Sequence, residues 1–317
     1  MQTGTTVAVI DVGSNSIKLL VARRGADGPS AVEAVFAETV ETRISQGIGG
    51  ELPSLSEASM EAGAATIDDL AHLARVYRPA EIGVVATSAV RDALNGGEFV
   101  RRVRERSGME VEILEGDREA RLVGKGLSGE PALAGVHRFI QLDLGGGSLE
   151  LIRFRERVIE SAVSLRLGAV RLTERFVTDS EEGLPGPTEE AIREHVRAEV
   201  AESGFDFTPA DTPLIVTGGS FIAVRAILAA EAGQTLEASP PEITRERIAA
   251  LREQLTSLTL RERMAVPHLP AARADVIPTG LITVETILAL AGRDRVVHSV
   301  HHLRDGVAAE LLEAAGR

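Results

Sequence analysis

The 317-residue sequence contains no cysteine and no tryptophan. Without cysteine the chain can form no disulfide framework, no thiolate nucleophile and no Cys-ligated metal site. No apolar run reaches the roughly 18 residues that a membrane-spanning helix needs, and Glu285 interrupts the best late candidate, residues 281–290. The first residues also lack the basic and apolar regions of a secretory signal. These absences predict a cytoplasmic protein that does not bind membranes.

The sequence is also poor in positive charge, and above all in lysine. Its 34 basic residues stand against 47 acidic ones, which gives a formal net charge of −13, and Lys18 and Lys125 are the only lysines. This balance argues against a general affinity for nucleic acid. A polyanion must therefore be bound where positive groups are concentrated locally. Arginine suits such a place because it makes bidentate contacts with phosphate.

One short phrase occurs twice in the sequence. Residues 9–20 (VIDVGSNSIKLL) and 141–152 (QLDLGGGSLELI) repeat Asp, Gly, Ser and Leu at the same offsets. Each copy predicts a β-hairpin with an aspartate at the end of its first strand and a polar, glycine-containing tip. Backbone N–H groups at such a tip suit phosphate oxygens. Asp11 and Asp143 would repel a phosphate there unless Mg²⁺ or a positioned water lay between them.

The length and the order of predicted elements indicate two domains. A chain of 317 residues can bury two separate cores, and strands alternate with helices in both halves, which favours an α/β fold. The segment 127–134 contains Ser128, Gly129 and Pro131 and reads as a hinge. We therefore expect domains at residues 1–127 and 128–317, each opening with one of the hairpins, on either side of a phosphate-binding cleft.

The duplicated hairpin resembles that of the actin-like ATPase superfamily, and further motifs narrow the resemblance. In order along the chain they are Ala86–Ala93 (ATSAVRDA), Leu114–Leu122 (LEGDREARL), Gly168–Glu174 (GAVRLTE), Thr217–Gly219 (TGG) and Leu303–Gly306 (LRDG). Together they resemble the exopolyphosphatase / guanosine pentaphosphate phosphohydrolase family in a short, two-domain form. The resemblance implies two ribonuclease H-like domains with an interdomain cleft.

The resemblance also assigns roles to residues. It implies that Glu119 activates the attacking water and that Arg91, which directly follows a buried strand, contacts the phosphate. Mg²⁺ or another divalent cation is the implied cofactor, with Asp143, Glu150 and, by pseudo-symmetry, Asp11 as the carboxylates around it. The implied phosphate-binding residues are Gly13, Ser14, Asn15, Gly145, Gly146, Gly147 and Ser148, and Thr217, Gly218 and Gly219 resemble a loop on the nucleoside side.

Other interpretations of these residues stay open at the level of sequence. Glu119 could be an exposed carboxylate in the first turn of a helix, and Glu150 a solvent-facing strand residue. Lys18 stands where the second hairpin has Glu150, so the two hairpins cannot have equivalent roles. Asn15 at a tight tip predicts a left-handed or side-chain-capped turn. The seven histidines show no metal-binding spacing, and a solvated or helix-capping role is expected for them.

The expected reaction is hydrolysis of the terminal phosphoanhydride of inorganic polyphosphate, with release of orthophosphate. The alternative substrate within the family is guanosine pentaphosphate. A sugar or acetate kinase-like phosphotransferase and a non-catalytic phosphate or alarmone sensor are the alternatives from other classes. Longer family members carry a further C-terminal region, and its absence predicts a preference for shorter chains. A homodimer is plausible because symmetric dimers are the commonest oligomers.

Overall fold

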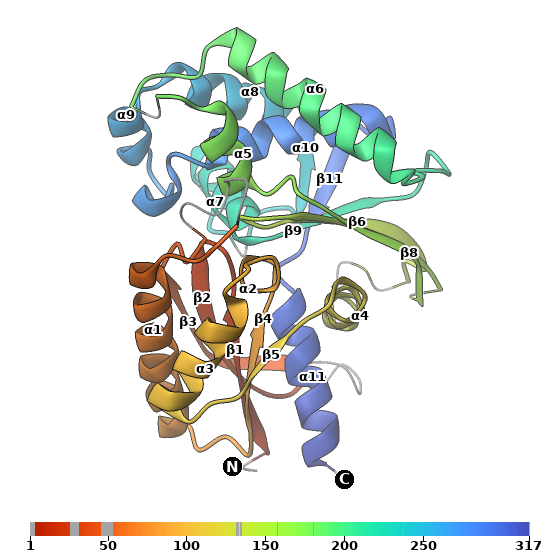
Figure 1. The fold of residues 1–317 in the computed structure, drawn as a ribbon. Helices are drawn as coiled ribbons and strands as arrows, with labels where there is room; N and C mark the ends of the chain where they lie inside the picture. Colours follow the sequence, from red (N-terminus) through yellow and green to blue (C-terminus); the bar gives the residue numbers. More distant parts are fainter. Residues whose placement is uncertain are drawn as a thin grey trace. The chain divides into compact units, whose positions relative to one another are not determined.

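The computed structural model describes residues 4–25, 32–45, 53–130, 133, 135–156, 158–179, 181–236 and 238–316. Its contacts divide the chain into two compact units (Figure 1). Unit 1 is Met1–Gly135 together with His301–Arg317, and unit 2 is Val136–Val300. This division differs from the expected boundary after residue 127, because residues 128–135 and the C-terminal segment group with unit 1. Of the expected hinge, residues 131, 132 and 134 lie outside the described residues.

Unit 1 is built on a five-stranded sheet in the order β3-β2-β1-β4-β5. The strands are β1 (Thr6–Val12), β2 (Ser16–Arg24), β3 (Val32–Glu41), β4 (Ile82–Ala86) and β5 (Val111–Ile113). β1, β2 and β3 are antiparallel neighbours, whereas β4 and β5 run parallel to β1. The carboxyl ends of β1, β4 and β5 therefore share one edge of the sheet, where α/β proteins commonly place functional groups.

Helices cover both faces of this sheet. They are α1 (Glu57–Val76), α2 (Ser88–Arg91), α3 (Gly96–Ser107), α4 (Gly116–Leu127) and α11 (Leu303–Ala315). The apolar stripe of α1 packs with Ala8, Ile10 and Val12 of β1. Gly83 of β4 points to the opposite face, because residues alternate along a strand, and there it meets Leu311 of α11. The C-terminal helix is thus part of the first unit's core.

Unit 2 repeats this topology in a six-stranded sheet of order β10-β11-β9-β6-β7-β8. The strands are β6 (Arg138–Leu144), β7 (Leu149–Arg155), β8 (Val158–Leu165), β9 (Leu214–Thr217), β10 (Glu242–Thr244) and β11 (Arg295–His298). β6, β7 and β8 form the antiparallel part, and β9 and β11 run parallel to β6. The duplication in sequence is therefore a duplication of fold, to which unit 2 adds the edge strand β10.

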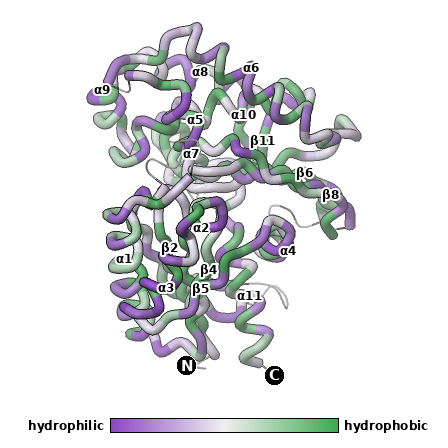
Figure 2. The backbone as a smooth tube through the Cα atoms, viewed as in Figure 1, coloured by the Kyte–Doolittle hydropathy of each residue, from purple (hydrophilic) through white to green (hydrophobic). Residues whose placement is uncertain are grey.

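The helices of unit 2 are α5 (Ala169–Phe176), α6 (Gly186–Ser203), α7 (Gly219–Glu231), α8 (Arg245–Ser257), α9 (Leu260–Met264) and α10 (Ile277–Ala291). The last of these is apolar around most of its circumference and lies in the main core of the unit. Figure 2 shows the hydrophobic strands of both sheets beside helices whose colour alternates along their length. Among the described helices, none is both long and apolar enough to cross a membrane.

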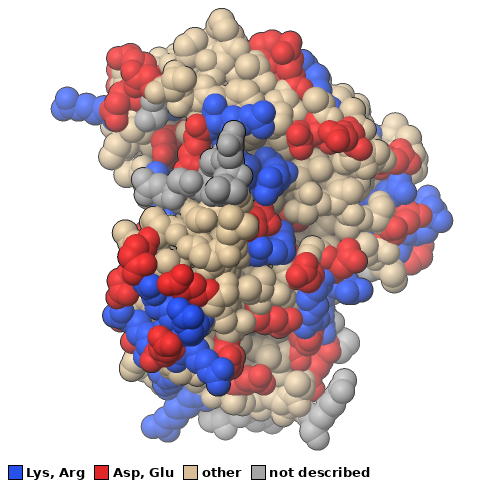
Figure 3. Space-filling model, in the orientation of Figure 1, with Lys and Arg blue, Asp and Glu red and all other residues tan. Residues whose placement is uncertain are grey.

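Many of the described arginines pair with acidic side chains at the surface. On α3, Arg102 donates to Glu57 of α1 at 2.6 Å, and Arg106 pairs with Glu61 one turn farther along. Figure 3 shows such alternation of basic and acidic side chains over these helices. Exposed pairs of this kind are worth little stability, about 0–1 kcal/mol each. The arginine content therefore does not by itself create a polyanion-binding surface.

Candidate active site

In unit 1, Arg91 and Glu119 form an ion pair in which the carboxylate is buried and the guanidinium partly buried. Arg91 ends the short helix α2 that follows β4, and Glu119 lies in the first turn of α4, which follows β5. Nη1 of Arg91 donates to Oε2 of Glu119 at 2.7 Å and to the carbonyl of Leu114 at 2.7 Å. Glu119 is only 7% exposed. It is therefore not a solvated first-turn carboxylate but one fixed in place by a guanidinium.

The first hairpin lies at the same edge of the sheet. The N–H of Gly13 closes its turn on the carbonyl of Ser16 at 3.1 Å, and the N–H of Thr87 at the end of β4 donates to the carbonyl of Val12. In the β1–β2 ladder Asp11 stands directly opposite Lys18. This carboxylate therefore faces a cation across the strands, and the first hairpin holds no carboxylate pair.

The tip of the first hairpin is supported by the segment after β3. The carbonyl of Ser14 accepts from the N–H and hydroxyl of Ser45, and the carbonyl of Asn15 accepts from the N–H groups of Thr42 and Arg43. The expected left-handed conformation of Asn15 is wrong, because its φ is not positive. Its side chain does not cap the turn but donates to Glu41 of β3. The tip is thus fixed by contacts with β3 and the residues that follow it.

The second hairpin, in unit 2, is closed in the same way by the N–H of Gly145, which donates to the carbonyl of Ser148 at 3.0 Å. Its support, however, comes from the first turn of α5. The carbonyls of Gly145 and Gly146 accept from backbone N–H groups of that turn, and Nε of Arg171 donates to the carbonyl of Gly147. In a trans peptide the N–H points opposite to the preceding carbonyl. The N–H groups of Gly146, Gly147 and Ser148 therefore point away from α5.

Gly168 explains how α5 approaches the hairpin so closely. A Cβ at this position would lie 2.3 Å from the carbonyl oxygen of Gly146 and 2.3 Å from the carbonyl carbon of Gly147. Distances of that size exclude any side chain. The motif Gly168–Glu174 thus supports the second hairpin by packing against the carbonyl groups of its tip. The sequence of the motif alone did not indicate this role.

The two carboxylates assigned to the second hairpin are neighbours. Asp143 of β6 stands directly opposite Glu150 of β7, and such partners have Cβ atoms about 4.5–5.5 Å apart on one face. Glu150 is 6% exposed, and its Oε1 accepts from the hydroxyl of Ser164 at 2.8 Å. The interpretation of Glu150 as a solvent-facing residue is therefore wrong.

Asp143 and Glu150 fit a Mg²⁺ ion that is bound only partly by the protein. Among the described residues, no group of three His, Asp or Glu side chains forms a complete protein cage for a metal. Mg²⁺ usually binds through one or two carboxylates and takes its remaining oxygens from water and substrate phosphate. Asp143 and Glu150 supply the two carboxylates that this mode requires, and the outward N–H groups of the neighbouring tip suit the phosphate.

The loop Thr217–Gly219 lies directly against Asp143. A Cβ on Gly218, whose φ is +105°, would lie 2.6 Å from the carbonyl oxygen of Leu144 and 3.2 Å from Oδ1 of Asp143. At Gly219 a Cβ would lie 2.4 Å from a guanidinium nitrogen of Arg273. Arg273, 8% exposed, is a residue that sequence reasoning missed. No short motif marks it, since it comes from a distant segment.

Helix α11 packs against α4, the helix that carries Glu119. A Cβ on Gly306 would lie 1.7 Å from the carbonyl oxygen of Leu122 in α4. Two ion pairs continue the contact, Arg118 with Glu310 at 2.6 Å and Lys125 with Glu313 at 2.7 Å. The motif Leu303–Gly306 is thus a packing element. It brings the end of the chain against the segment that contains the candidate base.

The expectation for the histidines is wrong in part. His302 is the N-cap residue of α11, where its backbone N–H donates to Oδ2 of Asp305 at 2.9 Å, but it is only 5% exposed. His298 is 1% exposed, and neither of its ring nitrogens has a hydrogen-bond partner in the described part of the chain. Burial, and secondarily the charge of Arg225, lowers the pKa of His298 to about 4. Both histidines are therefore buried rather than solvated.

Each unit gathers its predicted residues at the carboxyl edge of its own sheet. In unit 1 the gathered residues are Asp11, Gly13, Ser14, Asn15, Arg91 and Glu119. In unit 2 they are Asp143, Gly145, Gly146, Gly147, Ser148, Glu150, Thr217, Gly218 and Gly219. The carboxylate pair belongs to unit 2 and the carboxylate–guanidinium pair to unit 1.

Known proteins share both the sequence pattern and the fold. The family model of the Ppx/GppA phosphatase family matches residues 20–315. Exopolyphosphatase 2 of Mycobacterium tuberculosis (strain CDC 1551 / Oshkosh) is 31% identical over 322 residues, which cover 97% of this chain and 98% of that protein. An exopolyphosphatase from Cytophaga hutchinsonii has a similar structure, with a TM-score of 0.86, 23% identity and 98% of each chain covered.

The Ppx/GppA protein of Aquifex aeolicus is similar over 99% of both chains, with a TM-score of 0.76 and 21% identity. The expected α/β fold with two domains is thereby confirmed. The family match and the full-length relative agree with the resemblance seen in the sequence motifs. The chain belongs to the Ppx/GppA phosphatase family and is a phosphoanhydride hydrolase.

Proposed function

We propose that the protein is an exopolyphosphatase, which hydrolyses the terminal phosphoanhydride of inorganic polyphosphate and releases orthophosphate. The observation that carries the choice of substrate is the 31% identity to an exopolyphosphatase over nearly the whole length of both chains. The geometry of each unit supports the chemistry. Such a reaction needs a cradle for the phosphoryl group, a compensating charge and a carboxylate that orients water.

Glu119 takes the part of the carboxylate that orients water. Its hydrogen bond with Arg91 fixes the direction of its oxygens, and its burial keeps bulk water away. In the proposed step, the carboxylate of Glu119 accepts a proton from a water molecule while the oxygen of that water attacks the terminal phosphorus. The bond from that phosphorus to the bridging oxygen breaks, and the shortened chain leaves with the bridging oxygen. General-base assistance of this kind contributes about 10²–10⁴-fold in rate.

The hairpin tips take the part of the phosphate cradle. The outward N–H groups of Gly146, Gly147 and Ser148 can donate to phosphoryl oxygens without any movement of the chain, because α5 already fixes their peptide planes. Preorganised donors of this kind stabilise charge that develops in the transition state. Asp143 and Glu150 would hold Mg²⁺, which when bound would offset the negative charge of the phosphate oxygens.

A substrate panel tests this proposal. Orthophosphate release is measured from polyphosphates of several chain lengths and from guanosine pentaphosphate, each with and without Mg²⁺. The expected result is Mg²⁺-dependent release that is faster from polyphosphate than from guanosine pentaphosphate. Faster release from guanosine pentaphosphate would make that the substrate instead. ATP-dependent transfer to an acceptor without orthophosphate release would replace the hydrolase proposal with a kinase-like phosphotransferase.

A further inference from the structure

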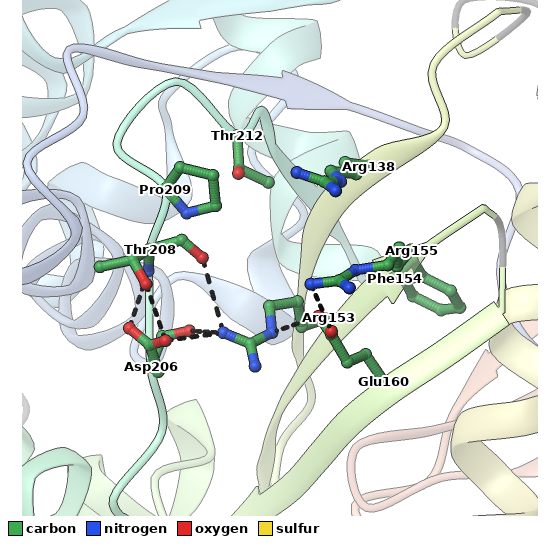
Figure 4. Close-up of a pocket in the computed structure, with 9 residues that line it drawn as sticks. All are labelled: Arg138, Arg153, Phe154, Arg155, Glu160, Asp206, Thr208, Pro209 and Thr212. Carbon is green, nitrogen blue, oxygen red and sulfur yellow. Dashed lines mark hydrogen bonds and ion pairs between the residues drawn. The ribbon is translucent and has the colours of Figure 1, made fainter.

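Unit 2 contains a cluster of arginines at the opposite end of the hairpin strands from Asp143. A cavity of about 180 Å³ is lined by Arg138, Arg153, Phe154, Arg155, Glu160, Asp206, Thr208, Pro209 and Thr212 (Figure 4). Arg138 and Asp143 are five residues apart on β6, which at about 3.4 Å per residue places them roughly 17 Å apart. This cavity, here called the arginine pocket, is therefore separate from the hairpin tip.

The strand register brings like charges together in the arginine pocket. Arg138, the first residue of β6, stands directly opposite Arg155, the last residue of β7. Arg153 lies two residues before Arg155 and so shares its face. Like charges directly opposite each other on neighbouring strands are destabilising. This arrangement is favourable only if negative charge lies between the guanidinium groups.

The carboxylates of the pocket orient two of the three arginines. Glu160 contacts Nε of Arg153 at 3.0 Å and Nη2 of Arg155 at 2.8 Å, and Oδ2 of Asp206 accepts from Arg153 at 2.9 Å. The backbone N–H and hydroxyl of Thr208, with Arg153, lower the pKa of Asp206 to about 2, so it remains charged. These carboxylates leave one of the three positive charges in the pocket unbalanced.

Two polar groups of the pocket have no partner in the described part of the chain. The guanidinium of Arg138 takes part in no hydrogen bond or ion pair there, and Oγ1 of Thr212, a residue only 4% exposed, is buried without a hydrogen-bond partner. Figure 4 shows Arg138, Arg155 and the Thr212 hydroxyl around the same opening. An unsatisfied buried hydroxyl is costly, and the cavity far exceeds the roughly 10–15 Å³ that one water requires.

We propose that the arginine pocket is a second anion site, which binds a phosphate group through Arg138, Arg155 and the hydroxyl of Thr212. Planar guanidinium groups bind phosphate in bidentate fashion, and the hydroxyl supplies a further donor. The phosphate is either free orthophosphate or a unit of a polyphosphate chain, since both present the same oxygens. The site does not depend on the proposed hydrolysis, because it lies at the other end of the strands.

Three variants of the full-length protein test the site. Arg138→Gln removes the charge of an exposed side chain. Thr212→Val removes only the hydroxyl, and without a ligand it should leave stability equal or higher because it deletes an unsatisfied group. Arg247→Gln on α8 is the matched control, an exposed arginine that pairs with Glu231 at 3.1 Å. Calorimetric titrations use orthophosphate in one arm and tripolyphosphate in the other, and crystals of each variant are soaked in selenate.

The expected result is a selenium anomalous peak within hydrogen-bond reach of Arg138 and Thr212, and one class of orthophosphate sites that weakens by about tenfold or more in Arg138→Gln. Arg247→Gln should bind as the wild type does, and turnover of polyphosphate should be unchanged in Arg138→Gln. Weakening confined to tripolyphosphate would identify the chain as the source of the phosphate. Binding that is unaltered by Arg138→Gln and Thr212→Val, or a selenate peak that persists in both as an adventitious ion only, would overturn the proposal.

Discussion

The guanidinium of Arg91 and the carboxylate of Glu119 meet at 2.7 Å across 28 residues of sequence. Each side chain follows a strand that runs parallel to β1, and the parallel pairing of β4 with β5 brings the two loops together. The same Arg91 nitrogen also donates to the carbonyl of Leu114, just before the loop that leads to α4. The pair therefore fixes both the direction of the carboxylate and the position of the helix that carries it.

Glu119→Gln should lower kcat for orthophosphate release by about 10²-fold or more, because an amide cannot accept the proton of the attacking water. KM should change little, since the amide still accepts a hydrogen bond from Arg91. Glu115→Gln is the matched control, a neighbouring glutamate that is exposed and makes no side-chain cap for α4. Equal turnover in Glu119→Gln and the control would remove Glu119 from the mechanism.

Asp143→Asn should weaken divalent-cation binding, because it removes one of the two carboxylates that face each other across β6 and β7. We expect the Mg²⁺ concentration for half-maximal activity to rise by about tenfold or more. Mn²⁺ binding measured by electron paramagnetic resonance gives a readout that does not depend on turnover. Asp294→Asn, at an exposed carboxylate paired with Arg295, should bind Mn²⁺ as the wild type does. A normal Mn²⁺ affinity in Asp143→Asn would contradict this role.

Gly306→Ala should destabilise unit 1 and impair catalysis together. Its Cβ would meet the carbonyl of Leu122 in α4, so α4 and α11 must separate. Overpacking of this kind costs about 1–3 kcal/mol or more, and the displaced α4 carries Glu119. Urea unfolding and kcat are the measurements. Gly97→Ala on α3, where a Cβ meets no atom, is the control and should be neutral or stabilising by up to about 1 kcal/mol. A free energy of unfolding in Gly306→Ala equal to that in Gly97→Ala would contradict close packing of α11 on α4.

Arg252→Met should destabilise unit 2. Arg252 on α8 bonds Glu189 of α6 at 2.8 Å and Glu285 of α10 at 2.7 Å, and all three side chains are largely buried. Removing this cation leaves the two carboxylates with Arg193, which lies 3.4 Å from Glu189 and 3.2 Å from Glu285. One positive charge then faces two largely buried negative ones, which should cost about 1–3 kcal/mol in the free energy of unfolding. Arg247→Met on the same helix breaks an exposed pair and should change stability by less than about 0.5 kcal/mol. Similar losses in the two variants would show that burial of the network is unimportant.

His298 should make the protein less stable in mild acid. Its pKa of about 4 in the folded chain lies below the ordinary 6.5, so between these values the unfolded chain binds a proton that the folded chain does not. This loss of stability is absent above about pH 6.5, and it grows to the order of 3 kcal/mol as the pH falls towards 4. His298→Leu should therefore flatten the curve of unfolding free energy against pH in that window. Parallel curves for the two proteins would contradict the burial of a neutral ring.

The sequence determined the elements and the kind of chemistry. The duplicated hairpins were predictable because glycine, aspartate and alternating apolar residues act locally, through turn geometry and the two-residue period of a strand. The family resemblance followed from the same motifs, and the matches confirm it. The roles of Glu119, Asp143 and the hairpin tips stay predictions, although the structure places each at the carboxyl edge of a sheet.

Only the tertiary structure decided which groups are paired, buried or supported from a distance. The burial of Glu119 and Glu150, the support of the second hairpin by Gly168 and the contact of Arg273 with Gly219 all join residues from separate segments. Helix α11 belongs to the first unit because Gly306 lets it approach α4, almost two hundred residues earlier in the chain. Sequence patterns report preferences over a few neighbouring residues, whereas close packing between distant elements decides the partner of each buried polar group.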